Sequence, residues 1–173
     1  MLRIIKRLKP FFEDCYREIG VREYSREMGV SPPTASKILK DFSSENLLNE
    51  RIERGYLLFK INRDSFILQR LSEIYWTEKL GRLVEYINLE LYNPTIVLFG
   101  SLSKLEVTDS SDIDLAIFST LNKEIDLQKY ERLLKRKVQI FHFNSLEEVN
   151  KELINNILNG NILSGRIEYD GLD

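Results

Sequence analysis

The chain has 173 residues, of which 43% are hydrophobic and 30% are charged, and its formal net charge at pH 7 is −2. This composition is ordinary for a globular protein of one or two domains. Lys and Arg interrupt the first apolar residues too often for a signal sequence or a membrane span, so we expect a cytoplasmic protein with no membrane partner. A single cysteine excludes an internal disulfide, and a single histidine excludes His-rich zinc sites.

The charges are distributed unevenly along the chain. Residues 1–60 hold 12 Lys and Arg against 9 Asp and Glu, whereas residues 61–173 hold 13 against 18. A basic first third suggests an anionic partner such as nucleic acid, although a solvated charged surface has the same composition.

The first third predicts three helices followed by a hairpin. Apolar residues at helical spacing indicate helices over 11–20 and 21–28, each closed by a glycine. Ser31 before Pro32 is a typical helix start and predicts a third helix. Two short strands joined at Arg54-Gly55 then predict a β-hairpin with a basic tip.

This segment, "VREYSREMGVSPPTASKILKDFSSENLLNERIERGYLLFKIN", resembles the winged helix domains of prokaryotic transcription regulators. The resemblance implies that double-stranded DNA is a partner, with the third helix in the major groove and the hairpin tip at the adjacent backbone. It implies DNA contacts by two base readers and four phosphate-binding side chains: Thr34, Ser36, Lys37, Lys40, Arg51 and Arg54. The alternative is a module for protein contacts, including a homodimer.

The middle of the chain is predicted to be helical from about Asp64 to Tyr92. Its apolar stripe changes phase near Tyr75-Trp76-Thr77, which predicts a helix break or a domain boundary there. We therefore divide the chain into a winged helix-turn-helix domain over 1–62, a linker helix over 63–76, and a second domain over 77–173.

The second domain alternates strands and helices. Apolar runs predict strands at "TIVLFG", "SDIDLAIF" and "RKVQIFHF", and helices are predicted over 122–136 and 145–158. The expected fold class is α/β (α+β), with a small mixed β-sheet flanked by helices.

One motif in this domain carries chemistry. Gly100-Ser101 ends the first strand with a sharp turn whose amides suit a phosphate, and Ser101 adds a hydroxyl donor. Ten residues later, Asp112 and Asp114 share one face of the next strand. Two carboxylates opposite a phosphate cradle are suited to Mg²⁺, or Mn²⁺, delivered with a nucleoside triphosphate.

The segment "IVLFGSLSKLEVTDSSDIDLAIF" resembles the nucleotidyltransferase domain of the DNA polymerase β superfamily, most closely its minimal prokaryotic members. The resemblance implies NTP binding, with ATP the expected nucleotide, by Gly100 and Ser101, and it suggests a triphosphate contact by Lys104. It implies that Asp112 and Asp114 are the catalytic and metal-binding carboxylates. Leu105 departs from the glycine that relatives often have there.

Active members of the superfamily bring a third carboxylate from the strand after the helix, and here the matching position is Gln139. A glutamine can offer an oxygen to a cation but brings no negative charge and cannot act as a base. His142, three residues later, is expected on the opposite face of the strand. The sequence therefore indicates an enzyme or a nucleotide binder without separating the two.

Three functions remain open at this point. The chain is either a nucleotidyltransferase or a nucleotide-responsive DNA-binding regulator; an antitoxin that nucleotidylates or masks a toxin partner; or a transcription regulator whose nucleotidyltransferase domain is an inactive scaffold.

Overall fold

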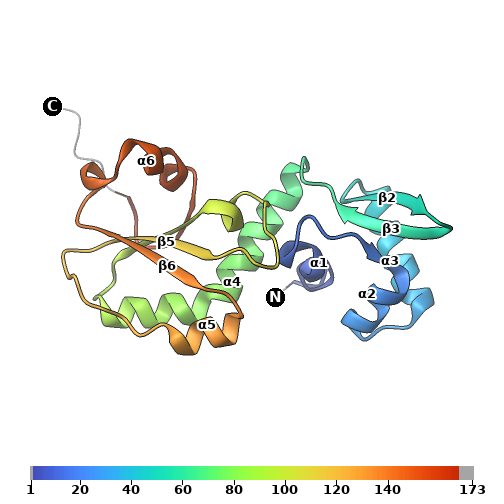
Figure 1. Ribbon diagram of the computed structural model, residues 1–173, viewed down its shortest axis with the longest axis horizontal. Helices are drawn as coiled ribbons and strands as arrows, with labels where there is room; N and C mark the ends of the chain where they lie inside the picture. Colours follow the sequence, from blue (N-terminus) through green and yellow to red (C-terminus); the bar gives the residue numbers. More distant parts are fainter. Residues whose placement is uncertain (1, 168–173) are drawn as a thin grey trace. The chain divides into compact units, whose positions relative to one another are not determined.

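The computed structural model describes residues 2–167 and contains both helices and strands (Figure 1), so the predicted α/β class is confirmed. The chain divides into two compact units. The N-terminal unit comprises the residues up to Tyr75 together with Leu105–Asp109, and the C-terminal unit comprises Trp76–Lys104 and the residues from Ser110 onward.

The N-terminal unit begins with helices that differ in part from the prediction. They are α1 (Arg3–Glu13), α2 (Val21–Met28) and α3 (Pro32–Ser44). The predicted helix over 11–20 is wrong in its bounds. The Asp14 carboxylate accepts the amides of Tyr16 at 2.9 Å and Arg17 at 3.1 Å, and this local turn ends α1 early.

The N-terminal unit also holds a three-stranded antiparallel sheet. Its strands are β1 (Ile19–Gly20), β2 (Leu48–Glu53) and β3 (Tyr56–Ile61), in the order β1-β3-β2. The predicted hairpin is confirmed, because Glu53 pairs with Tyr56 and the two residues between them, Arg54 and Gly55, have φ values of 49° and 80°. Two consecutive positive φ values are typical of a type I′ turn.

Helix α4 (Phe66–Glu90) passes unbroken through the position where the apolar pattern changes phase. Tyr75 packs against Phe12 in the N-terminal unit, with ring centroids 5.5 Å apart. The next residue, Trp76, lies under Arg136 in the C-terminal unit. The phase therefore changes because consecutive residues belong to different cores, and the helix itself does not break.

Leu105–Asp109 is the part of the N-terminal unit that lies far along the chain. The Cys15 amide donates a hydrogen bond of 2.7 Å to the Val107 carbonyl, and both residues are fully buried. The loop between the Gly-Ser turn and the two aspartates is therefore anchored at Val107.

The C-terminal unit is built on a mixed sheet. Its strands are β4 (Thr95–Phe99), β5 (Ile113–Phe118), β6 (Val138–Phe143) and β7 (Asn161–Ser164), in the order β6-β5-β4-β7. Strands β5 and β6 are parallel and the other pairs are antiparallel. A parallel pair needs a crossover, and helix α5 (Gln128–Leu134) supplies it.

Helices cover both faces of this sheet: α4 and α5 lie on one side and α6 (Lys151–Leu158) lies on the other (Figure 1). Short 3₁₀ turns, η1 (Gly100–Ser103) and η2 (Leu146–Glu148), follow β4 and β6. Helix α5 is shorter than predicted, and α6 begins later than the predicted start at 145. The Asn150 side chain accepts the Leu153 amide at 2.9 Å and caps α6 there.

The face of the sheet toward α6 holds a hydrophobic core that includes Phe99 and Ile157, and Phe118 and Phe141 pack against it. Strand alternation places Asp114 on the same face as Phe118, at the other end of β5. The two carboxylates thus lie at the edge of this core, at the end of β5 opposite Phe118. Residues 2–167 contain no helix that is both long and apolar enough to cross a membrane.

Candidate nucleotide-binding site

The site is built around the turn that ends β4. Gly100 has a φ of +75°, and a Cβ added there would overlap Oδ2 of Asp114 and lie 3.2 Å from its Cγ. Any other residue would therefore meet both backbone strain and a direct clash. This contact shows that the Gly-Ser turn and the Asp-x-Asp motif, ten residues apart in sequence, meet in the structure.

Asp114 lies on β5 and is paired with a residue of each neighbouring strand. It pairs with Phe99 of β4 on one side and with Gln139 of β6 on the other. Burial, with a further contribution from the negative charge of Asp112, raises the pKa of the Asp114 carboxyl above its ordinary value. A cation between the two carboxylates would offset this cost, so the electrostatics of the pair fit a metal ligand.

Gln139 lies where the sequence predicts it, beside the two aspartates. Its Nε2 donates a hydrogen bond of 2.6 Å to Oδ2 of Asp112. Because a carboxylate only accepts, the amide nitrogen rather than the oxygen must face it. The third position of the site therefore presents a donor to Asp112.

The donor set fits one divalent cation better than two. Asp112 and Asp114 provide oxygen ligands of the type that Mg²⁺ prefers, and Gln139 can contribute an amide oxygen only if its side chain turns over. Within residues 2–167, no group of three or more His, Cys, Asp or Glu side chains is placed to hold a metal ion. The remaining ligands would have to come from phosphate and water.

Lys104, at the end of η1, is directed toward helix α6. Its Nζ donates a hydrogen bond of 2.7 Å to Oδ1 of Asn156. This bond is between exposed groups, so a bound anion could compete with it. Sequence reasoning missed Asn156, and nothing in the local pattern of α6 marks it.

Leu105 has the left-handed backbone conformation that usually favours glycine. Its φ is +56°, and its side chain is 1% exposed. A left-handed conformation costs a non-glycine residue about 1–2 kcal/mol, which the burial of a leucine offsets. The backbone path expected of a glycine is therefore retained.

His142 is not part of the site. It lines a separate pocket with Leu91, Ile140 and the loop before α5, on the face of the sheet opposite Gln139. Its Nε2 is buried and has no hydrogen-bond partner among the described residues. The alternation of β6 therefore leaves no role for His142 as a base at the Asp pair.

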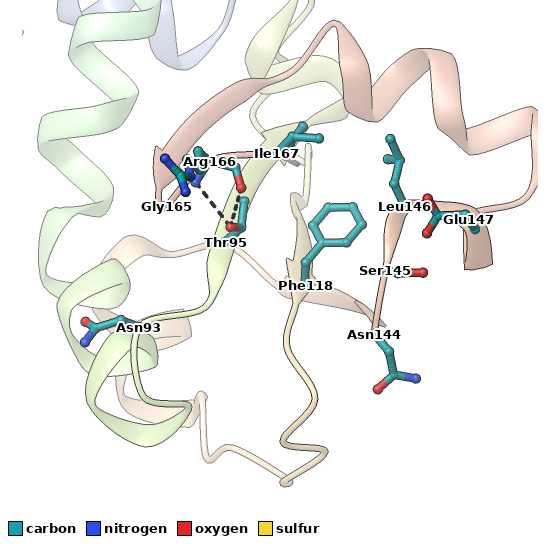
Figure 2. A pocket seen from close by; sticks show the side chains of 10 residues that line it. All are labelled: Asn93, Thr95, Phe118, Asn144, Ser145, Leu146, Glu147, Gly165, Arg166 and Ile167. Atoms are coloured by element: carbon teal, nitrogen blue, oxygen red, sulfur yellow. Dashed lines mark hydrogen bonds between the residues drawn. The ribbon is translucent and has the colours of Figure 1, made fainter. Parts of the chain in front are cut away.

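Another pocket, of about 470 Å³, lies at the opposite end of the sheet (Figure 2). Thr95 and Phe118, which pair at that end, line it, and Thr95 Oγ1 donates a 2.8 Å hydrogen bond to the Arg166 carbonyl. The Asp pair lies at the end where Phe99 pairs with Asp114. The two features are therefore separate.

The N-terminal candidates have different surroundings. Thr34, Lys37, Lys40 and Arg54 are exposed and Ser36 is half-buried. The Thr34 hydroxyl shares a 2.9 Å hydrogen bond with Ser31 at the cap of α3. Arg51 forms an ion pair with Glu18 and a second, at 3.0 Å, with Glu53. The charge of Arg51 is thus already balanced by these two carboxylates.

A second residue that sequence reasoning missed is Arg136. It is 9% exposed, and its Nη1 donates a 2.6 Å hydrogen bond to the carbonyl of Ser111, the residue before Asp112. In the sequence it is one of three consecutive basic residues, Lys135-Arg136-Lys137, which read as a solvated charged run. Only its burial distinguishes it.

Comparison with protein families places the site in context. The family model described as "Polymerase beta, Nucleotidyltransferase" matches residues 82–168, which is half of the chain and includes both motifs. A search of curated proteins finds no match. The match to the family model, together with the meeting of the Gly-Ser turn and the Asp pair, shows that this chain belongs to the polymerase β nucleotidyltransferase family.

Proposed function

We propose that the C-terminal unit binds a nucleoside triphosphate with one divalent cation, and that it transfers the nucleotide slowly or not at all. The observation that carries this proposal is the contact between Gly100 and the Asp114 carboxylate. It brings a turn suited to phosphate within reach of carboxylates suited to the accompanying cation.

Each residue has a separate part in this proposal. The Gly100-Ser101 turn would hold the phosphates through main-chain amides and the Ser101 hydroxyl, and Lys104 would exchange Asn156 for a phosphate oxygen. Asp112 and Asp114 would hold Mg²⁺ or Mn²⁺, which neutralises phosphate charge and orients the α-phosphate.

Gln139 is the reason to expect slow transfer. Transfer of a nucleoside monophosphate requires an acceptor hydroxyl to bond to the α-phosphorus while the bond to the β-phosphate breaks and pyrophosphate leaves. The hydroxyl proton must go to a base, and an amide cannot accept it. With Gln139 donating to Asp112, the chain provides binding groups without the third carboxylate.

Calorimetric titration tests the binding. Wild-type protein is expected to bind Mg-ATP, and Asp112→Asn and Asp114→Asn are each expected to weaken binding at least about tenfold, because each removes a charged ligand. Asp109→Asn changes an exposed carboxylate just upstream and should leave affinity unchanged. Absence of Mg-ATP binding by the wild type, or equal affinity in all variants, would overturn the proposal.

We further propose that the N-terminal unit binds double-stranded DNA through α3 and the β2-β3 hairpin. The supporting observation is that Lys37 and Lys40 are both exposed on α3, with Arg54 exposed at the hairpin tip. Thr34 and Ser36 would read base edges. Nucleotide binding could then regulate DNA binding, and titration of labelled duplex with and without Mg-ATP tests this link.

A further inference from the structure

The candidate site contains a buried positive charge that the proposed chemistry does not use. Arg136 is 9% exposed, and burial of an ionised group costs several kcal/mol unless hydrogen bonds or other charges compensate. Its guanidinium lies over the ring of Trp76, with 5.4 Å from Cζ to the centroid, and Nη1 donates to the Ser111 carbonyl at 2.6 Å. Both contacts lie within the C-terminal unit.

The hydrogen bond to Ser111 acts on the peptide group that joins Ser111 to Asp112. The peptide group on the other side of Asp112 is also held, because the Ile113 amide donates a 2.8 Å hydrogen bond to the Lys137 carbonyl. Since peptide groups are planar, fixing both of them fixes φ and ψ of Asp112 and hence the direction of its Cα–Cβ bond.

The carboxylate itself has a third restraint, the 2.6 Å hydrogen bond from Gln139. The groups that restrain the Asp112 carboxylate and its two flanking peptide groups thus come from one run of four residues, 136–139, at the start of β6. Among them Arg136 is the one whose side chain reaches back to the loop before β5. A lysine could not replace it, because an ammonium group lacks the planar guanidinium that stacks on an indole ring while its N–H groups donate hydrogen bonds in the plane.

We propose that Arg136 is a positioning residue for the cation-binding carboxylate Asp112. This inference rests on the proposed function of the Asp pair. Cation affinity depends on the direction of Asp112, whereas the phosphate contacts at Gly100 and Ser101 do not. Loss of Arg136 should therefore weaken cation binding while nucleotide binding without the cation persists.

The test uses full-length Arg136→Lys, with Arg132→Gln as the control, since Arg132 is an exposed arginine on α5. Mn²⁺ binding is measured by the loss of the free Mn²⁺ signal in electron paramagnetic resonance, and ATP binding is measured by calorimetry in EDTA. Circular dichroism melts monitor folding. Arg136→Lys is expected to raise the Kd for Mn²⁺ about tenfold or more, the usual effect of losing an outer-shell partner.

In the same variant the Kd for ATP in EDTA should stay within about twofold of wild type, and Arg132→Gln should change neither constant. Unchanged Mn²⁺ affinity in Arg136→Lys, or equal losses of Mn²⁺ and metal-free ATP binding, would overturn the positioning role alone. A wild-type protein that binds no Mn²⁺ would overturn the proposed function as well, so the two failures are distinct. Arg136→Gln provides a second variant for the same comparison.

Discussion

Gln139 Nε2 and Asp112 Oδ2 are 2.6 Å apart, and this hydrogen bond joins the starts of two parallel strands at the candidate site. Gln139 is a neutral hydrogen-bond donor at the position where active members of the superfamily have a third carboxylate. Asp112 therefore has a neutral amide as its partner at this position.

The first prediction concerns this position. Gln139→Asp should raise nucleotidyl transfer from α-labelled ATP about 100-fold, because a carboxylate can both bind a cation and accept the hydroxyl proton. The measurement is label transfer to protein or RNA acceptors at saturating Mg²⁺. Gln139→Asn, which keeps the amide, is the control; equal rates for the two variants would contradict the prediction.

The second prediction concerns the turn. Gly100→Ala should destabilise the protein by about 2 kcal/mol or more, since alanine is strained at positive φ and its Cβ meets the Asp114 carboxylate. Mg-ATP affinity should fall with it. Gly81→Ala is the matched control, because a Cβ there meets nothing within 4 Å and α4 should gain up to about 1 kcal/mol. Urea unfolding of both variants measures the contrast.

The third prediction concerns pH. Because the pKa of Asp114 is raised in the folded protein, the unfolded chain ionises first, and stability falls as pH rises from the unfolded pKa through the folded one. Asp114→Asn should therefore raise the melting temperature by a few degrees at pH 7.5 in EDTA. This advantage should shrink as pH falls through the folded pKa. A variant less stable than wild type at pH 7.5 would contradict the expected sign.

The fourth prediction concerns Lys104. Lys104→Ala should weaken Mg-ATP binding about tenfold, the value of one charge-assisted hydrogen bond, whereas Asn156→Ala should leave affinity equal or higher because it frees Nζ from its present partner. Lys151→Ala, at another exposed lysine, is the control. If Asn156→Ala weakened binding as much as Lys104→Ala, the exchange of partners would be wrong.

The fifth prediction concerns DNA. If α3 faces the duplex, Lys37→Ala and Lys40→Ala should each reduce the slope of log Kobs against log salt concentration by about 0.9, the contribution of one phosphate contact. Arg51→Ala should leave the slope unchanged, because Glu18 and Glu53 already neutralise Arg51. Fluorescence anisotropy of a labelled duplex at several salt concentrations measures the slopes.

The sequence by itself determined the features that follow local rules. Gly29 closes α2 with a φ of +63°, the Ser31 side chain caps α3, and Arg54-Gly55 forms the hairpin turn, because each depends only on backbone conformation and neighbouring donors. The spacing from Gly100 to the Asp pair likewise identified both halves of the candidate site.

The tertiary structure decided what depends on residues distant in sequence. The Asp14 turn and the pairing of Ile19 with Phe59 override the helical pattern of residues 14–20. Arg136 is buried and contacts Trp76 and Ser111, both far away in the chain. Periodicity reports which face of an element is apolar, but it carries no information on which partner meets a polar group. The direction of Asp112 is therefore fixed by contacts that no local pattern contains.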